Sequence, residues 1–108
     1  MIHLFIINGN FWVAIDGEKV VGTLSLKNLG NNIGMLKGMY VHRDYRNKRI
    51  ASKLMDILLK FAKIQKYKEL VLETYEKLDV AIEFYKKRGF TLKEKDEDRY
   101  IFTKELNI

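Results

Sequence analysis

The sequence contains no cysteine and no proline among its 108 residues. Without cysteine, the chain has no disulfide scaffold, no thiolate zinc site and no cysteine nucleophile, and it suits a reducing, cytoplasmic setting. No apolar run approaches the roughly 20 residues that a membrane-spanning helix needs, so we expect no membrane partner. The apolar start, residues 1–7, lacks a basic segment and a cleavage site. We therefore expect it to be mature structure rather than a signal peptide.

Histidine is scarce as well, and the two that occur, His3 and His42, stand far apart in the sequence. With no cysteine and no paired histidine, the sequence predicts no metal site. Hydrophobic residues make up 47% and charged residues 31% of the chain, which is an ordinary composition for a folded protein. The length predicts a single domain over residues 1–108.

The charge is unbalanced, with 20 Lys and Arg against 14 Asp and Glu, for a net charge of +6. A basic surface favours an anionic partner, which leaves nucleic acid, a membrane surface or a small polyanion such as a nucleotide. The same surface can also serve solubility alone, so charge by itself does not choose among these.

Apolar spacing and turn residues divide the chain into eight elements. The runs 11–15 and 19–27 flank Asp16-Gly17, which predicts a β-hairpin, and 28–32 has the composition of a loop. In order, the predicted elements are strands 11–15, 19–27 and 34–42, a helix 50–66, a strand 69–74, a helix 77–88, and a closing hairpin 90–95 and 99–104. We therefore predict an α+β fold in the order β-β-β-α-β-α-β-β.

The middle of this order implies a parallel strand pair joined by a right-handed crossover, so the sheet is mixed but mostly antiparallel. Gly34 and Gly38 within one predicted strand suggest a bulge or a close backbone approach. Gly89 ends the second helix after a basic last turn.

A cationic turn precedes the first helix and contains Arg43, Arg46, Lys48 and Arg49. A helix N-terminus presents free backbone N–H groups and a partial positive charge, which together favour phosphate. The small residues Ala51 and Ser52 would let a pyrophosphate approach the backbone. The alternative is a solvated basic turn before an ordinary helix.

Two motifs in this order resemble the GCN5-related N-acetyltransferase (GNAT) superfamily. Val41-x4-Arg46-Asn-Lys-Arg-Ile-Ala51 is similar to its motif A, Arg/Gln-x-x-Gly-x-Gly/Ala after a strand. Ala81-x-x-Phe84-Tyr85-x-x-x-Gly89-Phe90 is similar to its motif B. The hairpin with Gly22 also resembles the family's, and the resemblance covers about residues 10 to 105.

The resemblance implies transfer of an acetyl group from acetyl-CoA to a primary amine of a small molecule or protein, by direct attack in a ternary complex. It places the pyrophosphate on the cationic turn and the pantetheine arm beside the strand before it, with no metal. The cofactor-binding residues it implies are Met39, Tyr40, Val41, Arg46, Asn47, Lys48, Arg49, Ile50, Ala51 and Ser52.

Tyr85 matches the family's general acid. A phenol with a pKa near 10 can return a proton to a leaving thiolate with a pKa near 8.5. The competing interpretation is that Tyr85 is a core aromatic on an apolar helix stripe.

The sequence departs from the family pattern at several positions. Arg49 replaces the central glycine of motif A, and its side chain either crowds the phosphates or points outward. Leu78 stands where asparagine is common. Residues 34–42 hold no carboxylate, which leaves water, backbone or Glu73 as the base.

The front of the chain departs most from that pattern. The family begins with a strand and two helices, for which the residues before Phe11 are too few. We therefore expect a shortened member that lacks them, with an acceptor side that is open or completed by a second copy in a homodimer.

Two other functions fit parts of the sequence. One is a non-catalytic relic of the fold that binds CoA or another protein. The other is a basic nucleic-acid-binding α+β module, because 37–41 faintly echoes an RNA-binding strand. That segment lacks the run of aromatic residues that such strands use, so no nucleic-acid partner is expected.

Overall fold

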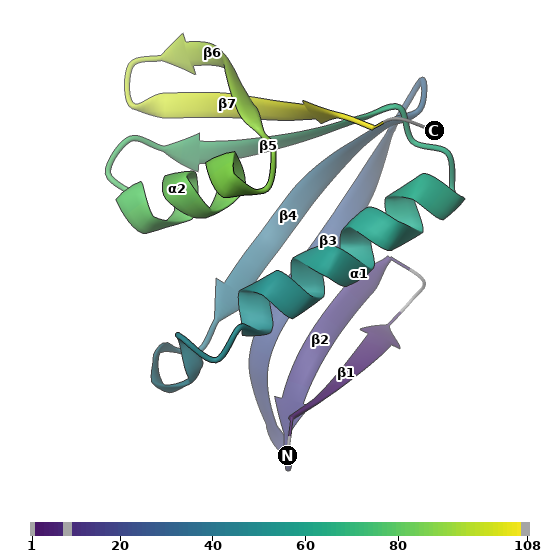
Figure 1. Ribbon diagram of the computed structural model, residues 1–108, viewed down its shortest axis with the longest axis vertical. Helices are drawn as coiled ribbons and strands as arrows, with labels where there is room; N and C mark the ends of the chain where they lie inside the picture. The colour runs from purple at the N-terminus through teal and green to yellow at the C-terminus, as the bar shows by residue number, and fades with distance from the viewer. Residues whose placement is uncertain (1, 8–9, 107–108) are drawn as a thin grey trace.

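The structure is a computed structural model, and it describes residues 2–7 and 10–106. Within these residues, seven strands form one sheet in the order β1-β2-β3-β4-β5-β7-β6, with two helices (Figure 1). The elements are β1 (Ile2–Ile7), β2 (Phe11–Asp16), β3 (Lys19–Gly30), β4 (Ile33–Val41), the 3-10 turn η1 (Arg43–Tyr45), α1 (Ile50–Ile64), β5 (Glu69–Tyr75), α2 (Asp79–Lys87), β6 (Thr91–Asp96) and β7 (Arg99–Glu105).

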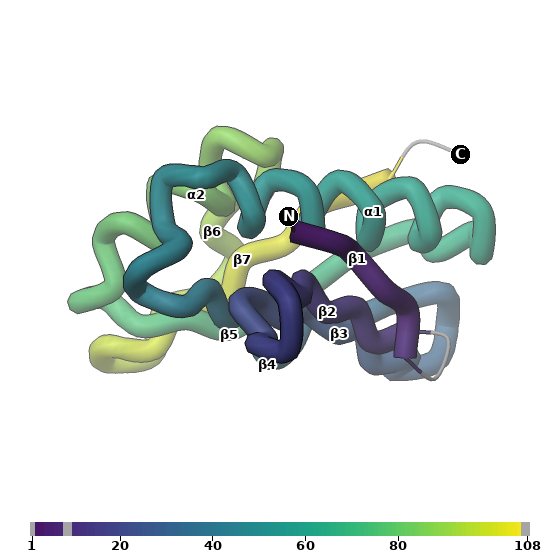
Figure 2. The backbone as a smooth tube through the Cα atoms, turned by 90° about the horizontal axis from the view of Figure 1, so that it is seen from below, coloured from purple at the N-terminus to yellow at the C-terminus, as the bar shows by residue number. Residues whose placement is uncertain are grey.

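The mixed sheet confirms the predicted fold class. β4 and β5 pair in parallel across α1, and every other neighbouring pair is antiparallel. Both helices lie on one face of the sheet, so the opposite face carries no helix in the described part of the chain (Figure 2). Neither helix among the described residues is long and apolar enough to cross a membrane.

The structure adds one strand to the predicted order. Residues 2–7 form β1, which pairs antiparallel with β2 over its whole length, from Ile2 opposite Asp16 to Ile7 opposite Phe11. Ile2 and Leu4 pack against the core, which is why this segment is extended. The run is apolar at nearly every position, so the two-residue period that identifies a half-buried strand is hidden in its sequence.

The predicted loop over 28–32 is mostly strand. β3 continues to Gly30, and the turn to β4 is only Asn31-Asn32, both with positive φ (55° and 65°). Asparagine tolerates this left-handed conformation and is favoured in two-residue hairpin turns.

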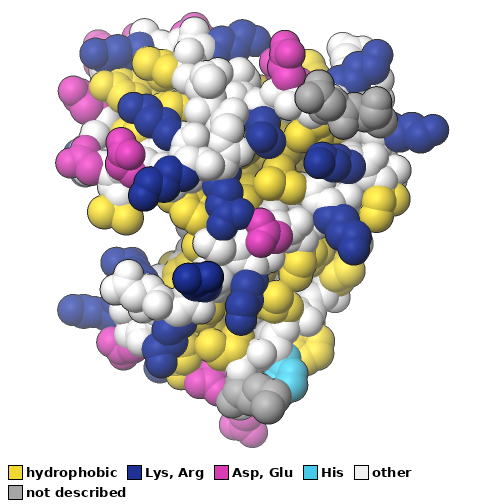
Figure 3. All heavy atoms as spheres, viewed as in Figure 1, with side chains coloured by type: hydrophobic (Ala, Val, Ile, Leu, Met, Phe, Trp, Pro, Cys, Tyr) yellow, Lys and Arg dark blue, Asp and Glu magenta, His cyan; other side chains and the backbone are white. Residues whose placement is uncertain are grey.

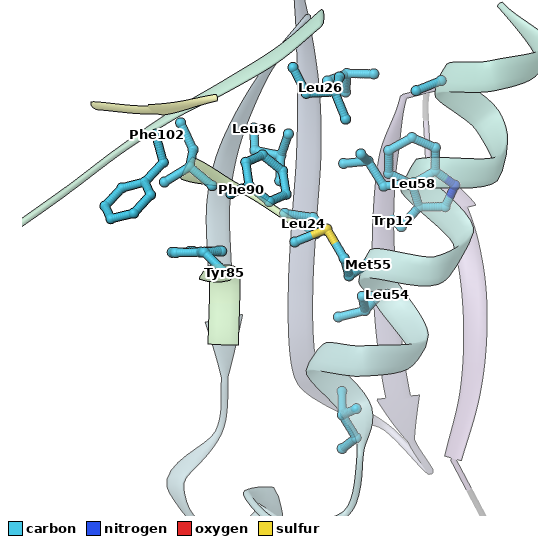
Figure 4. Close-up of a cluster of buried hydrophobic side chains, with 14 of the residues drawn as sticks. Trp12, Leu24, Leu26, Leu36, Leu54, Met55, Leu58, Tyr85, Phe90 and Phe102 are labelled. Carbon is cyan, nitrogen blue, oxygen red and sulfur yellow. The ribbon is translucent and has the colours of Figure 1, made fainter. Parts of the chain in front are cut away.

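The core is one cluster of buried side chains between the sheet and the helices (Figure 4). Under α1, Trp12 packs edge-on against Phe61, with 5.1 Å between ring centroids. Under α2, Tyr85 lies near Phe90 and Phe102. Gly22 lets α1 approach β3 closely, because a Cβ there would lie 2.8 Å from Cγ2 of Ile50.

Candidate active site

The parallel strands β4 and β5 separate soon after they meet. They pair only over three positions, from Ile33 opposite Glu69 to Met35 opposite Val71. Just beyond, β4 carries an extra residue against β3, at Gly38–Met39, and Gly38 has a φ of 63°. This confirms the bulge that the glycines suggested. Because a bulge bends and twists its strand, it accounts for β4 leaving β5 here.

A cleft of about 540 Å³ opens between the separated strands. It appears in Figure 3 as a hollow at the left of the molecule, between the α2 side and the turn before α1. Its lining residues are Met35, Leu36, Lys37, Gly38, Met39, Leu72, Glu73, Thr74, Tyr75, Leu78, Ala81 and Tyr85. They come from β4, from β5 and from the segment leading into and forming α2, so both halves of the sheet build the cleft.

The edge of β4 that faces this cleft has no strand partner from residue 36 to residue 41 within the described chain. Unpaired backbone N–H and C=O groups along an extended segment can pair with an extended ligand, as an added strand would. Met39 and Val41 pack partly against the core, whereas the Tyr40 side chain is 46% exposed.

The cationic turn leads directly into α1. Its residues 46–49 are exposed, and Asn47 and Arg49 have left-handed backbone conformations, with φ of 67° and 62°. Arg49 is the N-cap residue, yet its side chain makes no capping hydrogen bond. Lys53 donates the first intrahelical bond, 3.0 Å to the Arg49 carbonyl. The amides at the start of α1 are therefore available to an anion.

The conformation of Arg49 explains why glycine is usual in the motif that it resembles. A φ of 62° is the left-handed region that glycine adopts without cost and that most other residues avoid. The Arg49 side chain is exposed, which fits the outward-pointing alternative and adds a cation near the turn.

Tyr45 fixes this turn to the rest of the molecule. Its hydroxyl donates a 2.6 Å hydrogen bond to Oδ2 of Asp16, at the end of β2. That bond lowers the pKa of the Asp16 carboxyl and raises the pKa of the Tyr45 phenol. The ammonium groups of Lys19 and Lys48 each lie 5.7 Å from the centroid of the Tyr45 ring. Sequence reasoning did not find this contact, because nothing local links residues 29 positions apart.

Tyr85 is a core aromatic that also reaches the cleft. It belongs to the core cluster, with 9% of its surface exposed, and it also lines the cleft. Its hydroxyl makes no hydrogen bond to another described residue. Burial raises the pKa of the phenol, which therefore stays protonated at neutral pH and can donate a proton or a hydrogen bond.

The end of α2 holds Tyr85 in place. The amides of Arg88 and Phe90 both donate to the Tyr85 carbonyl, at 3.0 and 3.1 Å, while the Gly89 amide donates to Lys86. This is a Schellman ending, and the φ of 91° at Gly89 provides the left-handed residue that it requires.

Glu73 and Leu78 also line the cleft. The Glu73 carboxylate accepts from Nε of Arg99 at 2.9 Å and from the Tyr75 hydroxyl at 3.3 Å. Leu78 is the N-cap of α2 and makes no side-chain capping bond. Lys37, on the opposite wall, was not among the residues that the sequence singled out for the site.

Comparisons with known proteins bear on the family to which the chain belongs. A family model described as the acetyltransferase (GNAT) family matches residues 3–90. A probable N-acetyltransferase camello from Xenopus laevis is 38% identical over 85 residues, covering 77% of this chain and 39% of that protein. An N-acetylaspartate synthetase from Xenopus tropicalis is 37% identical over 81 residues, covering 74% of this chain and 30% of that protein. The chain thus spans about two-fifths or less of these curated relatives.

Solved structures share the fold. A GNAT-family acetyltransferase from Staphylococcus aureus superposes with a TM-score of 0.82 at 32% identity, covering 90% of this chain and 68% of that one. An N-acetyltransferase from Thermoplasma acidophilum, solved in complex with coenzyme A, gives 0.83 at 26% identity, covering 89% and 60%. On the family match and these likenesses, the chain belongs to the acetyltransferase (GNAT) family.

Proposed function

We propose that this protein transfers the acetyl group of acetyl-CoA to an amine, by direct attack of the amine in a ternary complex. The observation that carries the proposal is the separation of β4 from β5 beside an uncapped helix N-terminus. One structural unit thereby offers an anion site, an unpaired strand edge and a cleft with a buried phenol.

The cosubstrate would be held by two of these features. The cationic turn and the start of α1, over Arg46 to Ser52, supply exposed cations and the first amides of α1 for the pyrophosphate. The free edge of β4 at Met39–Val41 supplies backbone groups for the pantetheine amides. The coenzyme A complex of the Thermoplasma protein, which shares this fold, supports the choice of cosubstrate.

The chemistry would take place in the cleft. Acetyl-CoA supplies an activated acyl group whose transfer releases a thiolate. Tyr85 lies on the side of the cleft that α2 covers, and its neutral phenol is suited to give that thiolate a proton. Met35 and Glu73 line the same cleft from strand positions that face away from the helices. The cleft therefore offers the acceptor an approach from the helix-free face.

Binding and turnover can be tested separately. We expect acetyl-CoA to raise the thermal unfolding temperature, because a ligand that binds only the folded protein stabilises it. We expect Tyr85→Phe to lower kcat by about a hundredfold or more, the usual contribution of a general acid, while the Kd for CoA stays nearly unchanged.

Tyr67→Phe is the matched control, since Tyr67 lies outside this cleft and its substitution should leave kcat unchanged. Equal turnover in wild type and Tyr85→Phe would remove Tyr85 from the mechanism. CoA binding with no transfer to any amine would instead identify a non-catalytic relic.

A further inference from the structure

Two opposite charges flank the point where β4 and β5 separate. Met35 and Val71 are the last residues directly paired between the two strands. Side chains two positions along a strand share a face, so Lys37 and Glu73 are the next residues on that same face. It is the face away from the helices, because the alternate residues, such as Leu36 and Leu72, are buried beneath them.

These two side chains are also the charged groups of the cleft itself. Among its lining residues, Glu73 is the one carboxylate and Lys37 the one ammonium, and they stand on opposite walls. Adjacent strands lie about 4.8 Å apart, and Lys37 and Glu73 are a single two-residue step beyond the last pair. The opening that they frame therefore suits a small molecule.

Two neighbouring side chains orient the Glu73 carboxylate. Arg99 and the Tyr75 hydroxyl both contact its Oε1 atom, at 2.9 and 3.3 Å. A carboxylate can accept about four hydrogen bonds, so capacity remains for an amine. Lys37 is exposed and forms no ion pair within the described residues. Arg99 already pairs with Glu73 and lies 3.9 Å from Oδ2 of Asp96, so Lys37 is the cation of the opening that can attract a carboxylate.

We propose that this opening selects an acceptor that carries both an amine and a carboxylate, as a free amino acid does. Glu73 receives the amine and directs it into the cleft, and Lys37 pairs with the carboxylate. The inference rests on the proposed acetyl transfer and names the substrate class for that same site.

The test compares kcat/KM, at saturating acetyl-CoA, across a panel of free amino acids and their carboxamides, which keep the amine and lack the carboxylate. We expect the best amino acid to exceed its carboxamide by about tenfold or more, the usual size of one charged hydrogen bond. Lys37→Gln should remove that preference by lowering kcat/KM for the amino acid alone. The KM for acetyl-CoA should not change.

Lys27→Gln is the matched control. Lys27 lies opposite Met35 on the same face of the sheet, one strand away, and does not line the cleft. It should keep the wild-type preference. Glu73→Gln should lower kcat/KM for both members of each pair, because both carry the amine.

The outcomes separate two kinds of failure. Equal use of amino acids and carboxamides by the wild type, or an unchanged preference in Lys37→Gln, would overturn the acceptor assignment while acetyl transfer stands. No transfer to any amine in the panel, which includes compounds without a carboxylate, would overturn the proposed function and this inference with it.

Discussion

The two halves of the sheet differ in the length of the helix that covers each and in how many residues that helix buries. The half formed by β1–β4 lies under α1, which has 15 residues and buries Ile50, Leu54, Met55, Leu58 and Ala62. The half formed by β5–β7 lies under α2, which has nine residues and buries only Ile82 and Tyr85. The halves meet through three directly paired positions of β4 and β5. The larger half holds the proposed anion site, the smaller half holds Tyr85, and the cleft lies at the narrow join between the halves.

The largest expected effects compare the parts of the core under the two helices. We expect Leu58→Ala to lower the free energy of unfolding by about 2–5 kcal/mol, because Leu58 is fully buried under α1. Ile82→Ala should fall at or below the low end of that range, since Ile82 keeps 8% exposure under a shorter helix. Urea denaturation of both variants measures the difference. Equal losses would mean that the two helices are anchored alike.

The next variant acts on the join itself. A Cβ at Gly34 would lie 2.8 Å from Cδ1 of Leu26 and 3.2 Å from Cδ2 of Leu70, in the opposite half. We expect Gly34→Val to lower the free energy of unfolding by about 1–3 kcal/mol through overpacking. Gly34→Ala should cost less, and a ranking of the two by urea denaturation checks this. An unchanged free energy of unfolding in Gly34→Val would show that the side chains around Gly34 can move to make room for valine.

A smaller effect, of opposite sign, is expected at the proposed anion site. Arg49 has a left-handed conformation that glycine adopts more easily, so Arg49→Gly should raise the free energy of unfolding by up to about 1 kcal/mol. The same change removes a cation and should weaken CoA binding, which titration calorimetry can measure. Unchanged binding would indicate that the backbone amides alone hold the phosphates.

The smallest effect concerns the tie between Tyr45 and Asp16. The hydrogen bond lowers the pKa of the Asp16 carboxyl. The stability that the bond contributes is therefore present above the usual aspartate range and is lost as pH falls through the lowered pKa. Because the pKa of Tyr45 is raised, the contribution is lost again as pH rises past the usual tyrosine range near 10.

Tyr45→Phe should therefore be slightly less stable than wild type between about pH 4 and pH 10, and the two should converge in acid below that window. Chemical denaturation at a series of pH values checks the shape. A difference that persists at pH 2 would assign the effect to packing of the ring instead.

Much of the architecture could be predicted from local patterns. Asp16-Gly17 marked a hairpin, Gly38 marked a bulge, and Gly89 marked the end of a helix, because each depends on a few adjacent residues. The crossover followed from the order of strand, helix and strand. β1 was not predicted, because its residues are apolar at nearly every position and the two-residue alternation of a half-buried strand cannot be seen in them.

The candidate site was less accessible from the sequence. The turn before α1 and Tyr85 carried motif-like spacing, so they stood out before any geometry was known. The opposition of Lys37 and Glu73 arises only from the register of a non-local parallel pair. The contact of Tyr45 with Asp16 likewise depends on how distant segments come together.

The Schellman ending of α2 carries a consequence for how this site can change. The same carbonyl that terminates the helix belongs to the residue proposed to protonate the leaving group. Gly89 takes no part in lining the cleft, yet any bulkier residue there would strain the left-handed backbone and bring its Cβ to 2.5 Å from Nζ of Lys104. The position of the Tyr85 phenol is thus restricted by a glycine that lies outside the cleft lining.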